Sequence, residues 1–161
     1  MVIVIMGVSG SGKTTVGSQL ARQLGWQFAD ADDYHSGQNV EKMRAGIPLT
    51  DADRRPWLDA MHTLISGWLA SHQNAVLACS ALRKCYRQIL QVDEQVRFVY
   101  LQGDRDLLFR RLLERPNHYM KASMLESQIN TLEEPADGLV LDANLTPAAI
   151  ISKIRMAWEL T

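Results

Sequence analysis

Five short apolar runs, rich in β-branched residues, predict buried strands. They are residues 2–6, 26–29, 75–79, 96–101 and 139–141. Between the first two runs, Val16, Leu20 and Leu24 recur at helical spacing. A helix between two strands brings the second strand back in the direction of the first, so the alternation predicts an α/β fold with parallel strands.

The polar segments between these runs predict helices and their ends. Helices are expected over 13–24, 39–44, 53–69, 105–114 and 122–133, in the segment that follows residues 80–87, and from Pro147 onward. Gly25 is expected as a C-cap and Asp104 as an N-cap. Asp53 is expected to cap the helix that carries Pro56 in its first turn. The apolar stripe of that helix includes Trp57 and Trp68, which are interpreted as core residues rather than ligand contacts.

Length, composition and charge narrow the class of protein. The 161 residues suit one domain, which we expect to span 1–161. The net charge is −1, so nucleic acid is not expected as a partner. The apolar runs are too short for a signal peptide or a membrane span, which predicts a cytoplasmic protein with no membrane partner. Cys79 and Cys85 lack the spacing of a zinc site, and Cys79 is expected to be a buried thiol.

The first predicted strand runs directly into a phosphate-binding pattern. Residues Gly7, Val8, Ser9, Gly10, Ser11, Gly12, Lys13 and Thr14 match G-x-x-x-x-G-K-[ST], the P-loop motif. Glycines let the backbone curl so that its N–H groups face phosphate oxygens, and the following helix N-terminus adds positive charge. Lys13 can reach the β- and γ-phosphates, and the Thr14 hydroxyl can bind Mg²⁺. The alternative, a chance Gly/Ser-rich loop, is disfavoured by the strand–loop–helix context.

Two aspartates follow the second predicted strand, at the edge where parallel sheets bind ligands. Asp30 and Asp32 can hold Mg²⁺ through water or accept a proton from a hydroxyl, and which residue has which role stays open. The alternative is that they cap the next helix. His35 follows in the same loop and is a weaker candidate.

Cationic and small residues near other predicted strand ends are further candidates. Arg54 and Arg55 lie at a helix start, where the helix dipole disfavours cations, so an anionic substrate is an attractive partner. Ser80 either allows close approach of a ligand or caps a helix. Arg111 and Arg115 precede the polar–aromatic segment 116–121, and residues 116–126 are predicted to form a mobile lid.

Several groups of residues carry a family resemblance. They are residues 6–14; Asp30, Asp32 and His35; Asn39, Lys42 and Met43; residues 46–58; residues 79–87; and Arg111, Arg115, His118 and Gln128. On these residues the sequence resembles the bacterial gluconokinase family of small P-loop kinases over essentially the whole chain. The P-loop alone indicates nucleotide binding; the segment from Gly46-Ile47-Pro48-Leu49 to Pro56-Trp57-Leu58 is more specific and carries the substrate assignment.

The resemblance implies a fold, a reaction and a set of roles. It implies the three-layer sandwich of nucleoside monophosphate kinases, with strand order 2-3-1-4-5, and a cytoplasmic homodimer. The implied reaction is ATP-dependent phosphorylation of D-gluconate to 6-phospho-D-gluconate for gluconate catabolism, with Mg²⁺ as cofactor. Lys13 would hold phosphate, Asp32 would orient and deprotonate the acceptor hydroxyl, and Arg111 and Arg115 would neutralise developing charge. The substrate would be bound by Asp32, His35, Arg54, Ser80, Lys84, Arg87 and His118.

Two alternatives remain at this point. The first is a kinase for another small anion, such as shikimate or a nucleoside monophosphate, against which the resemblance over residues 46–58 argues. The second is a nucleotide switch or binding module without transfer activity. The sequence lacks the Asn-Lys-x-Asp motif of GTPase switches, which argues against a switch of that kind.

Overall fold

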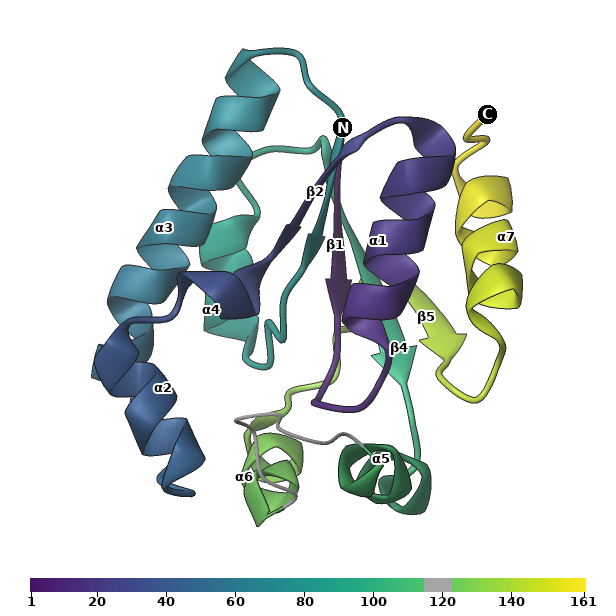
Figure 1. Ribbon diagram of the computed structural model, residues 1–161. Helices are drawn as coiled ribbons and strands as arrows, with labels where there is room; N and C mark the ends of the chain where they lie inside the picture. The colour runs from purple at the N-terminus through teal and green to yellow at the C-terminus, as the bar shows by residue number, and fades with distance from the viewer. Residues whose placement is uncertain (115–122) are drawn as a thin grey trace.

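A five-stranded parallel sheet forms the centre of the protein in a computed structural model that describes residues 1–114 and 123–161 (Figure 1). The strands are β1 (Val2–Met6), β2 (Gln27–Asp30), β3 (Ala75–Ala78), β4 (Val96–Gln102) and β5 (Leu139–Asp142). Their spatial order is β2-β3-β1-β4-β5, and each neighbouring pair is parallel. The predicted strand order is therefore confirmed.

Helices cover both faces of the sheet and its carboxyl edge. They are α1 (Lys13–Leu24), α2 (Gly37–Arg44), α3 (Asp51–Ala70), α4 (Lys84–Leu90), α5 (Arg105–Leu113), α6 (Ser123–Thr131) and α7 (Pro147–Ala157), with a 3₁₀ helix, η1 (Ala31–Tyr34). In Figure 1, α1 and α7 lie on one side of the sheet and α3 and α4 on the other. Helices α5 and α6 lie below the ends of the strands. This arrangement confirms the three-layer sandwich.

Strand β1 explains why the layers hold together. All five of its residues are buried, and their side chains alternate between the two faces. Val2, Val4 and Met6 join the core beneath α3 and α4, whereas Ile3 and Ile5 join the core beneath α1 and α7. A strand that is apolar at every position therefore has an apolar layer to contact on each side.

Helix α3 begins three residues earlier than the predicted N-cap at Asp53 would place it. Thr50 is its N-cap: the Thr50 hydroxyl accepts from the Asp53 amide at 3.1 Å, and the Asp53 carboxylate accepts from the Thr50 amide at 2.9 Å. This is a capping box, so the prediction that Asp53 is the N-cap was wrong. Pro56 consequently lies in the second turn rather than the first.

The start of helix α4 also corrects an alternative interpretation. Ser80 does not cap it, because α4 begins at Lys84 with Arg83 at the cap position and no side-chain cap from that residue. The Lys84 amide instead donates to the Glu133 carboxylate at 2.6 Å. By contrast, the caps at Gly25, with φ of 66°, and at Asp104, which accepts from the Leu107 amide at 2.8 Å, are confirmed.

The two cysteines have opposite surroundings. Cys79 is buried at the end of β3, and burial raises the pKa of its thiol to about 12. Cys85 is exposed on α4. Cys79 is thus the buried thiol that the sequence predicts. Within residues 1–114 and 123–161, no helix is both long and apolar enough to cross a membrane.

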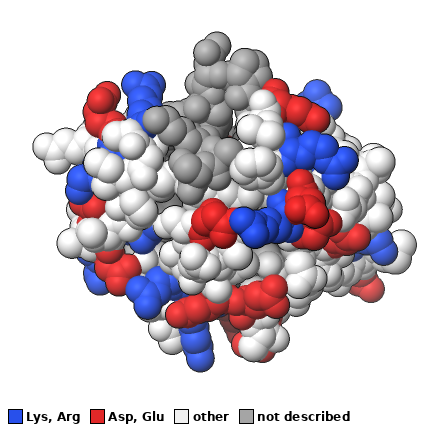
Figure 2. All heavy atoms as spheres, turned by 90° about the horizontal axis from the view of Figure 1, so that it is seen from below, with Lys and Arg blue, Asp and Glu red and all other residues white. Residues whose placement is uncertain are grey.

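The carboxyl edge of the sheet is covered by a separate apolar cluster. Val8, Leu82, Leu108, Leu112 and Leu125 pack together and connect α5 and α6 to the P-loop. Figure 2 shows the molecule from this end, and acidic and basic side chains are intermixed over the visible face. The cluster fixes two helices at the edge where the candidate site residues converge.

Candidate active site

The P-loop backbone is curled in a way that strongly favours glycine. Gly7, Gly10 and Gly12 have φ of 145°, 87° and 98°. A Cβ atom on Gly7 would lie 2.9 Å from the Leu101 carbonyl oxygen, and one on Gly10 would lie 2.9 Å from the Leu108 carbonyl oxygen. The motif glycines therefore serve both backbone conformation and close packing against neighbouring main chain.

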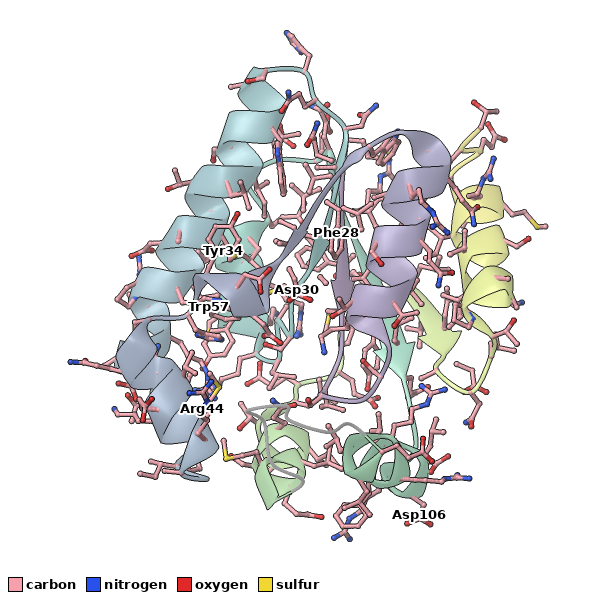
Figure 3. The ribbon with its side chains drawn as sticks, in the orientation of Figure 1. Phe28, Asp30, Tyr34, Arg44, Trp57 and Asp106 are labelled. Atoms are coloured by element: carbon pink, nitrogen blue, oxygen red, sulfur yellow. The ribbon has the colours of Figure 1, made fainter. Side chains whose placement is uncertain are left out.

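Three polar side chains meet where the P-loop enters α1. The Lys13 Nζ donates to the Val8 carbonyl at 3.1 Å. The Thr14 hydroxyl donates to Asp30 Oδ2 at 2.5 Å, and Asp30 Oδ1 accepts from the Asp32 amide at 3.0 Å. Figure 3 shows Asp30 at the end of β2, beside the start of α1. Asp30 thus joins the P-loop to η1, and it is also the N-cap of η1, as the capping alternative predicts.

Thr14 and Asp30 form a pair of oxygen atoms that suits Mg²⁺. No group of three or more His, Cys, Asp or Glu that could hold a metal ion occurs in the described residues. Magnesium in kinases is usually bound through one or two protein oxygens together with substrate phosphates and water. The hydroxyl–carboxylate pair next to the phosphate loop therefore fits the metal that the sequence predicts.

Beyond Lys13, a cavity opens between the P-loop, η1, α3 and α6, here called the strand-end cavity. Its lining residues are Ser9, Lys13, Asp32, His35, Met43, Leu49, Arg54, Trp57, Ser80, Leu82, Met124, Ser127 and Gln128. Six site residues predicted from the sequence meet here: Ser9, Lys13, Asp32, His35, Arg54 and Ser80. They come from four separate segments, so the fold brings together candidates that are up to 71 positions apart (80 − 9).

One wall of the strand-end cavity consists of two stacked rings. The His35 and Trp57 rings lie 4.5 Å apart with an interplanar angle of 12°. Trp57 Nε1 donates to the Ala31 carbonyl at 2.6 Å, which fixes the indole against η1 (Figure 3). Trp57 is therefore a core residue, as the sequence predicts, and it also lines the cavity.

Burial lowers the pKa of His35 below its usual value, and nearby Arg54 lowers it further, whereas Asp32 opposes the shift. His35 is thus neutral at physiological pH, with one ring nitrogen able to donate and one able to accept. Its Nδ1 is buried and has no hydrogen-bond partner among the described residues. A neutral imidazole of this kind suits a hydroxyl group.

Arg54 enters the cavity from the start of α3 with its side chain 16% exposed. Its Nη1 donates to the Tyr86 hydroxyl at 3.2 Å, and the guanidinium carbon lies 5.7 Å from the Tyr86 ring centroid. Arg55, the next residue, points to solvent and pairs with Asp59 at 2.9 Å. The two arginines that the sequence places together therefore have different surroundings.

Helix α6, which lies below the strand ends in Figure 1, forms one side of the strand-end cavity. The Ser9 amide of the P-loop donates to Gln128 Oε1 at 2.6 Å. Met43, Leu49 and Met124 pack together across the same opening. The cavity volume is only about 40 Å³, so a six-carbon ligand enters only when the elements around it separate.

Lys84 and Arg87 are not brought into the strand-end cavity. Arg87 donates to the carbonyl oxygens of Ala81 and Leu82 at 2.9 and 3.2 Å, which holds the loop after β3 from behind. Both side chains line another cavity, with Glu133 and Glu134. Arg115, His118 and residues 116–122 of the predicted lid lie outside the described residues; residues 123–126 belong to α6.

Arg111 lies on the other side of the P-loop. Its guanidinium donates to the carbonyl oxygens of Gly10 at 3.4 Å and Ala143 at 2.8 Å. It lines a cavity of about 330 Å³ with the P-loop glycines and the segment from Ala143 to Pro147, here called the Arg111 cavity. The P-loop therefore has a cavity on each side. A larger cavity of about 460 Å³, around Phe98 and Trp158, lacks every P-loop residue.

Comparison with known proteins identifies the family. The sequence pattern of the shikimate kinase family matches residues 9–157. A probable gluconokinase of Xenopus tropicalis is 46% identical over 173 residues, covering 96% of this chain and 91% of that protein. Gluconokinase of Gluconobacter oxydans (strain 621H) is 48% identical over 136 residues, covering 84% of this chain and 76% of that protein. The chain belongs to the gluconokinase family.

A solved structure of the gluconokinase family supports the same assignment. A gluconokinase from Sinorhizobium meliloti 1021 superposes with a TM-score of 0.84 at 39% identity, covering 98% of this chain and 94% of that chain. Membership of the gluconokinase family confirms the resemblance that the sequence motifs predict.

Proposed function

We propose that this protein transfers the γ-phosphoryl group of ATP to the primary hydroxyl of D-gluconate, giving ADP and 6-phospho-D-gluconate. In this reaction a bond forms between the hydroxyl oxygen and the γ-phosphorus, and the bond from that phosphorus to the β–γ bridging oxygen breaks. The proton of the hydroxyl passes to a carboxylate. Catalysis of this kind depends mainly on positioning and on neutralising charge.

The nucleotide belongs on the P-loop side. P-loop amides and Lys13 hold the β- and γ-phosphate oxygens, and the nucleoside extends into the Arg111 cavity of about 330 Å³. Arg111 lies beside this path and contributes positive charge. Mg²⁺, when bound by Thr14 and through water by Asp30, supplies further neutralisation of the phosphate oxygens. The short Thr14–Asp30 contact supports this pairing.

The acceptor belongs in the strand-end cavity. Asp32 lies on its wall together with Lys13, so a hydroxyl placed between them faces both a base and the phosphate site. Arg54 is the cation that we assign to the gluconate carboxylate, because a guanidinium matches a carboxylate in shape and charge. The neutral ring of His35 and the Ser80 hydroxyl then bind hydroxyl groups along the sugar acid.

The observation that carries this proposal is the meeting of Lys13, Asp32 and Arg54 in the lining of one cavity. The test is to incubate the purified protein with ATP, Mg²⁺ and one acceptor at a time: D-gluconate, shikimate, AMP or the neutral polyol D-glucitol. We expect ADP release, with a matching phosphate ester, chiefly from D-gluconate. Faster turnover with shikimate or AMP would contradict the substrate assignment, and no product from any acceptor would indicate a binding module.

We also propose that the protein acts as a homodimer, as the family resemblance implies. Light scattering on the eluting peak of a sizing column should give about twice the 18.1 kDa of one chain. A mass of one chain at assay concentrations would contradict this proposal.

A further inference from the structure

The side chain of Arg54 is held by a short series of polar contacts that leads away from the strand-end cavity. Arg54 Nη1 donates to the Tyr86 hydroxyl at 3.2 Å. That hydroxyl donates to Asp51 Oδ1, and Asp51 Oδ2 accepts from Arg83 Nη1 at 2.9 Å. These four residues, Arg54, Tyr86, Asp51 and Arg83, are called the Arg54 network below. They join α3 to α4 and to the residue that precedes it.

The direction of each hydrogen bond in the Arg54 network is fixed by chemistry. A guanidinium only donates and a carboxylate only accepts, whereas a phenol has one hydrogen to give. The Tyr86 hydrogen must therefore go to Asp51, which leaves an oxygen lone pair facing Arg54. The hydrogen bond from Tyr86 lowers the pKa of Asp51. Burial raises the pKa of Tyr86, and the hydrogen bond to Asp51 raises it further. Both groups therefore keep these protonation states at physiological pH.

The neutral phenol separates Arg54 from the nearest carboxylate. The Arg54–Asp51 separation is 4.0 Å, and among the described residues the Tyr86 hydroxyl is the one side-chain acceptor within hydrogen-bond distance of Arg54. A direct two-pronged ion pair with Asp51 would occupy the guanidinium edge that a ligand carboxylate needs. The Tyr86 hydroxyl instead accepts a hydrogen bond from one guanidinium nitrogen of Arg54 and leaves other guanidinium N–H groups for a ligand.

Arg55, the next residue on the same helix, has no contact with the Tyr86 hydroxyl among the described residues and provides a comparison for Arg54. Its side chain is 66% exposed and pairs directly with Asp59 one turn along α3, whereas that of Arg54 is 16% exposed. A solvent-exposed pair of this kind contributes little and leaves the side chain mobile. The two neighbours differ because successive residues of a helix face directions about 100° apart, and Arg54 lies on the side where the Arg54 network holds it.

We infer that Tyr86 and Asp51 are positioning residues for the acceptor: they hold the Arg54 guanidinium in its binding orientation before an anionic substrate arrives. The inference rests on the proposed function, in which Arg54 binds the carboxylate of gluconate. Fixing a long side chain in advance reduces the entropy lost on binding, so the benefit appears in substrate affinity. The transfer step itself, which involves Lys13 and Asp32, is not affected.

A double-mutant cycle tests this inference, with the unaltered protein, Tyr86→Phe, Arg54→Ala and the double variant assayed side by side. Tyr86→Phe keeps the ring under Arg54 and removes only the hydroxyl. We expect the KM for gluconate to rise about 10-fold, the loss typical of a hydrogen bond to a charged group. We expect kcat, the KM for ATP and the melting temperature to stay close to those of the unaltered protein. In the Arg54→Ala background, Tyr86→Phe should lower kcat/KM no further.

Arg55→Ala is the matched control, since it removes a neighbouring arginine that faces solvent. Asp51→Asn is the second variant, because its carboxylate is largely exposed and its loss leaves the Tyr86 ring in place. We expect it to raise the KM for gluconate several-fold, again only when Arg54 is present.

Two outcomes would overturn the inference. One is an equal effect of Tyr86→Phe with and without Arg54, which would mean that Tyr86 acts independently. The other is a gluconate KM in both Tyr86→Phe and Asp51→Asn equal to that of Arg55→Ala. These outcomes differ from a failure of the proposed function, in which the unaltered protein would not phosphorylate gluconate at all.

Discussion

The two sides of Lys13 are built in different ways. On the nucleotide side, eight consecutive residues form the P-loop, and their main-chain N–H groups and curled glycines provide the binding surface. On the acceptor side, the strand-end cavity is lined by side chains from η1, α2, α3, the loop after β3 and α6. Under the proposed function, phosphate recognition is local in sequence and made of backbone, whereas acceptor recognition is dispersed and made of side chains.

This difference indicates which side of Lys13 determines specificity for the acceptor. A backbone cradle recognises a group that every nucleotide triphosphate carries, so it selects a class of ligand. Side chains at separate positions can each match one feature of an acceptor, such as a carboxylate for Arg54 or a hydroxyl for His35. Substitutions on the two sides should therefore change different kinetic parameters.

The largest effect is expected where the two sides meet. Lys13→Met should lower turnover by at least about 10³-fold, because a charge that stabilises the transferring phosphoryl group is lost. The melting temperature should change little, since Lys13 serves the ligand rather than the core. Steady-state kinetics and thermal unfolding measure the two quantities. Lys153→Met on the exposed face of α7 is the control. Near-normal turnover in Lys13→Met would refute our account of the P-loop.

The next effect isolates the chemical step on the acceptor side. Asp32→Asn keeps the shape of the side chain but removes its charge and basicity, so kcat should fall by about 10²–10⁴-fold. The KM for ATP should change little. Asp33→Asn is the control, since Asp33 is adjacent but exposed. If the affinity for Mg²⁺-ATP fell as well in Asp32→Asn, Asp32 would hold the metal and Asp30 would be the better candidate base.

A smaller effect is expected for the substrate carboxylate. Arg54→Ala should raise the KM for gluconate by about 10- to 100-fold, the loss of a charge-assisted contact, while kcat changes less. The comparison that decides the role of Arg54 uses D-glucitol, which replaces the carboxylate by a neutral carbinol. Arg54→Ala should leave the much weaker kcat/KM for D-glucitol nearly unchanged. An equal loss with both acceptors would remove Arg54 as the carboxylate anchor.

The smallest effect concerns the stability of the acceptor side. Lys42 donates to Asp53 at 2.8 Å, and this contact, together with the Thr50 amide, lowers the pKa of Asp53 to about 2. A carboxyl group with a depressed folded-state pKa contributes stability above its unfolded value of 3.8, and this contribution is lost as the pH falls towards 2. Asp53→Asn should therefore lower the melting temperature at pH 7, and the difference should shrink between pH 4 and pH 2.

Asp59→Asn is the matched control for that titration, because Asp59 lies on the same helix and pairs with Arg55 at the surface. Thermal unfolding followed by circular dichroism across the pH series gives both curves. A melting-temperature difference that stays constant from pH 7 to pH 2 would show that the Asp53 charge is not the cause.

Much of the fold could be predicted because its signals are local. An apolar run, a glycine-rich turn and a helical stripe are each contained in a dozen residues, and the rule for parallel strand ends then places Asp32 near Lys13. Spacing alone does not give the strand order, which needed the family resemblance. The α3 boundary was misjudged because Asp53 and Thr50 are both good caps, and only the reciprocal contact shows which residue holds which position.

The features that escaped prediction depend on distant segments. Trp57 has the periodicity of a core residue, and periodicity does not separate a core position from a cavity wall that is equally buried. Glu133 accepts a hydrogen bond from the Lys84 amide although the two residues are 49 positions apart in the sequence, so no local pattern predicts this contact. Lys84 and Arg87 follow the end of a strand, but their side chains line a different cavity on the outer side of the loop after β3. Their distance from the strand end along the chain does not show on which side of the loop they lie.

The contrast between Cys79 and Cys85 has a practical consequence for experiments on this protein. Thiol reagents attack the thiolate, so a buried group with a pKa near 12 is inert under conditions in which an exposed one reacts. A maleimide dye should therefore label Cys85 alone, without any prior cysteine replacement. Because Cys85 adjoins Tyr86 on α4, the attached dye would report optically on the surroundings of Arg54 as acceptor is titrated.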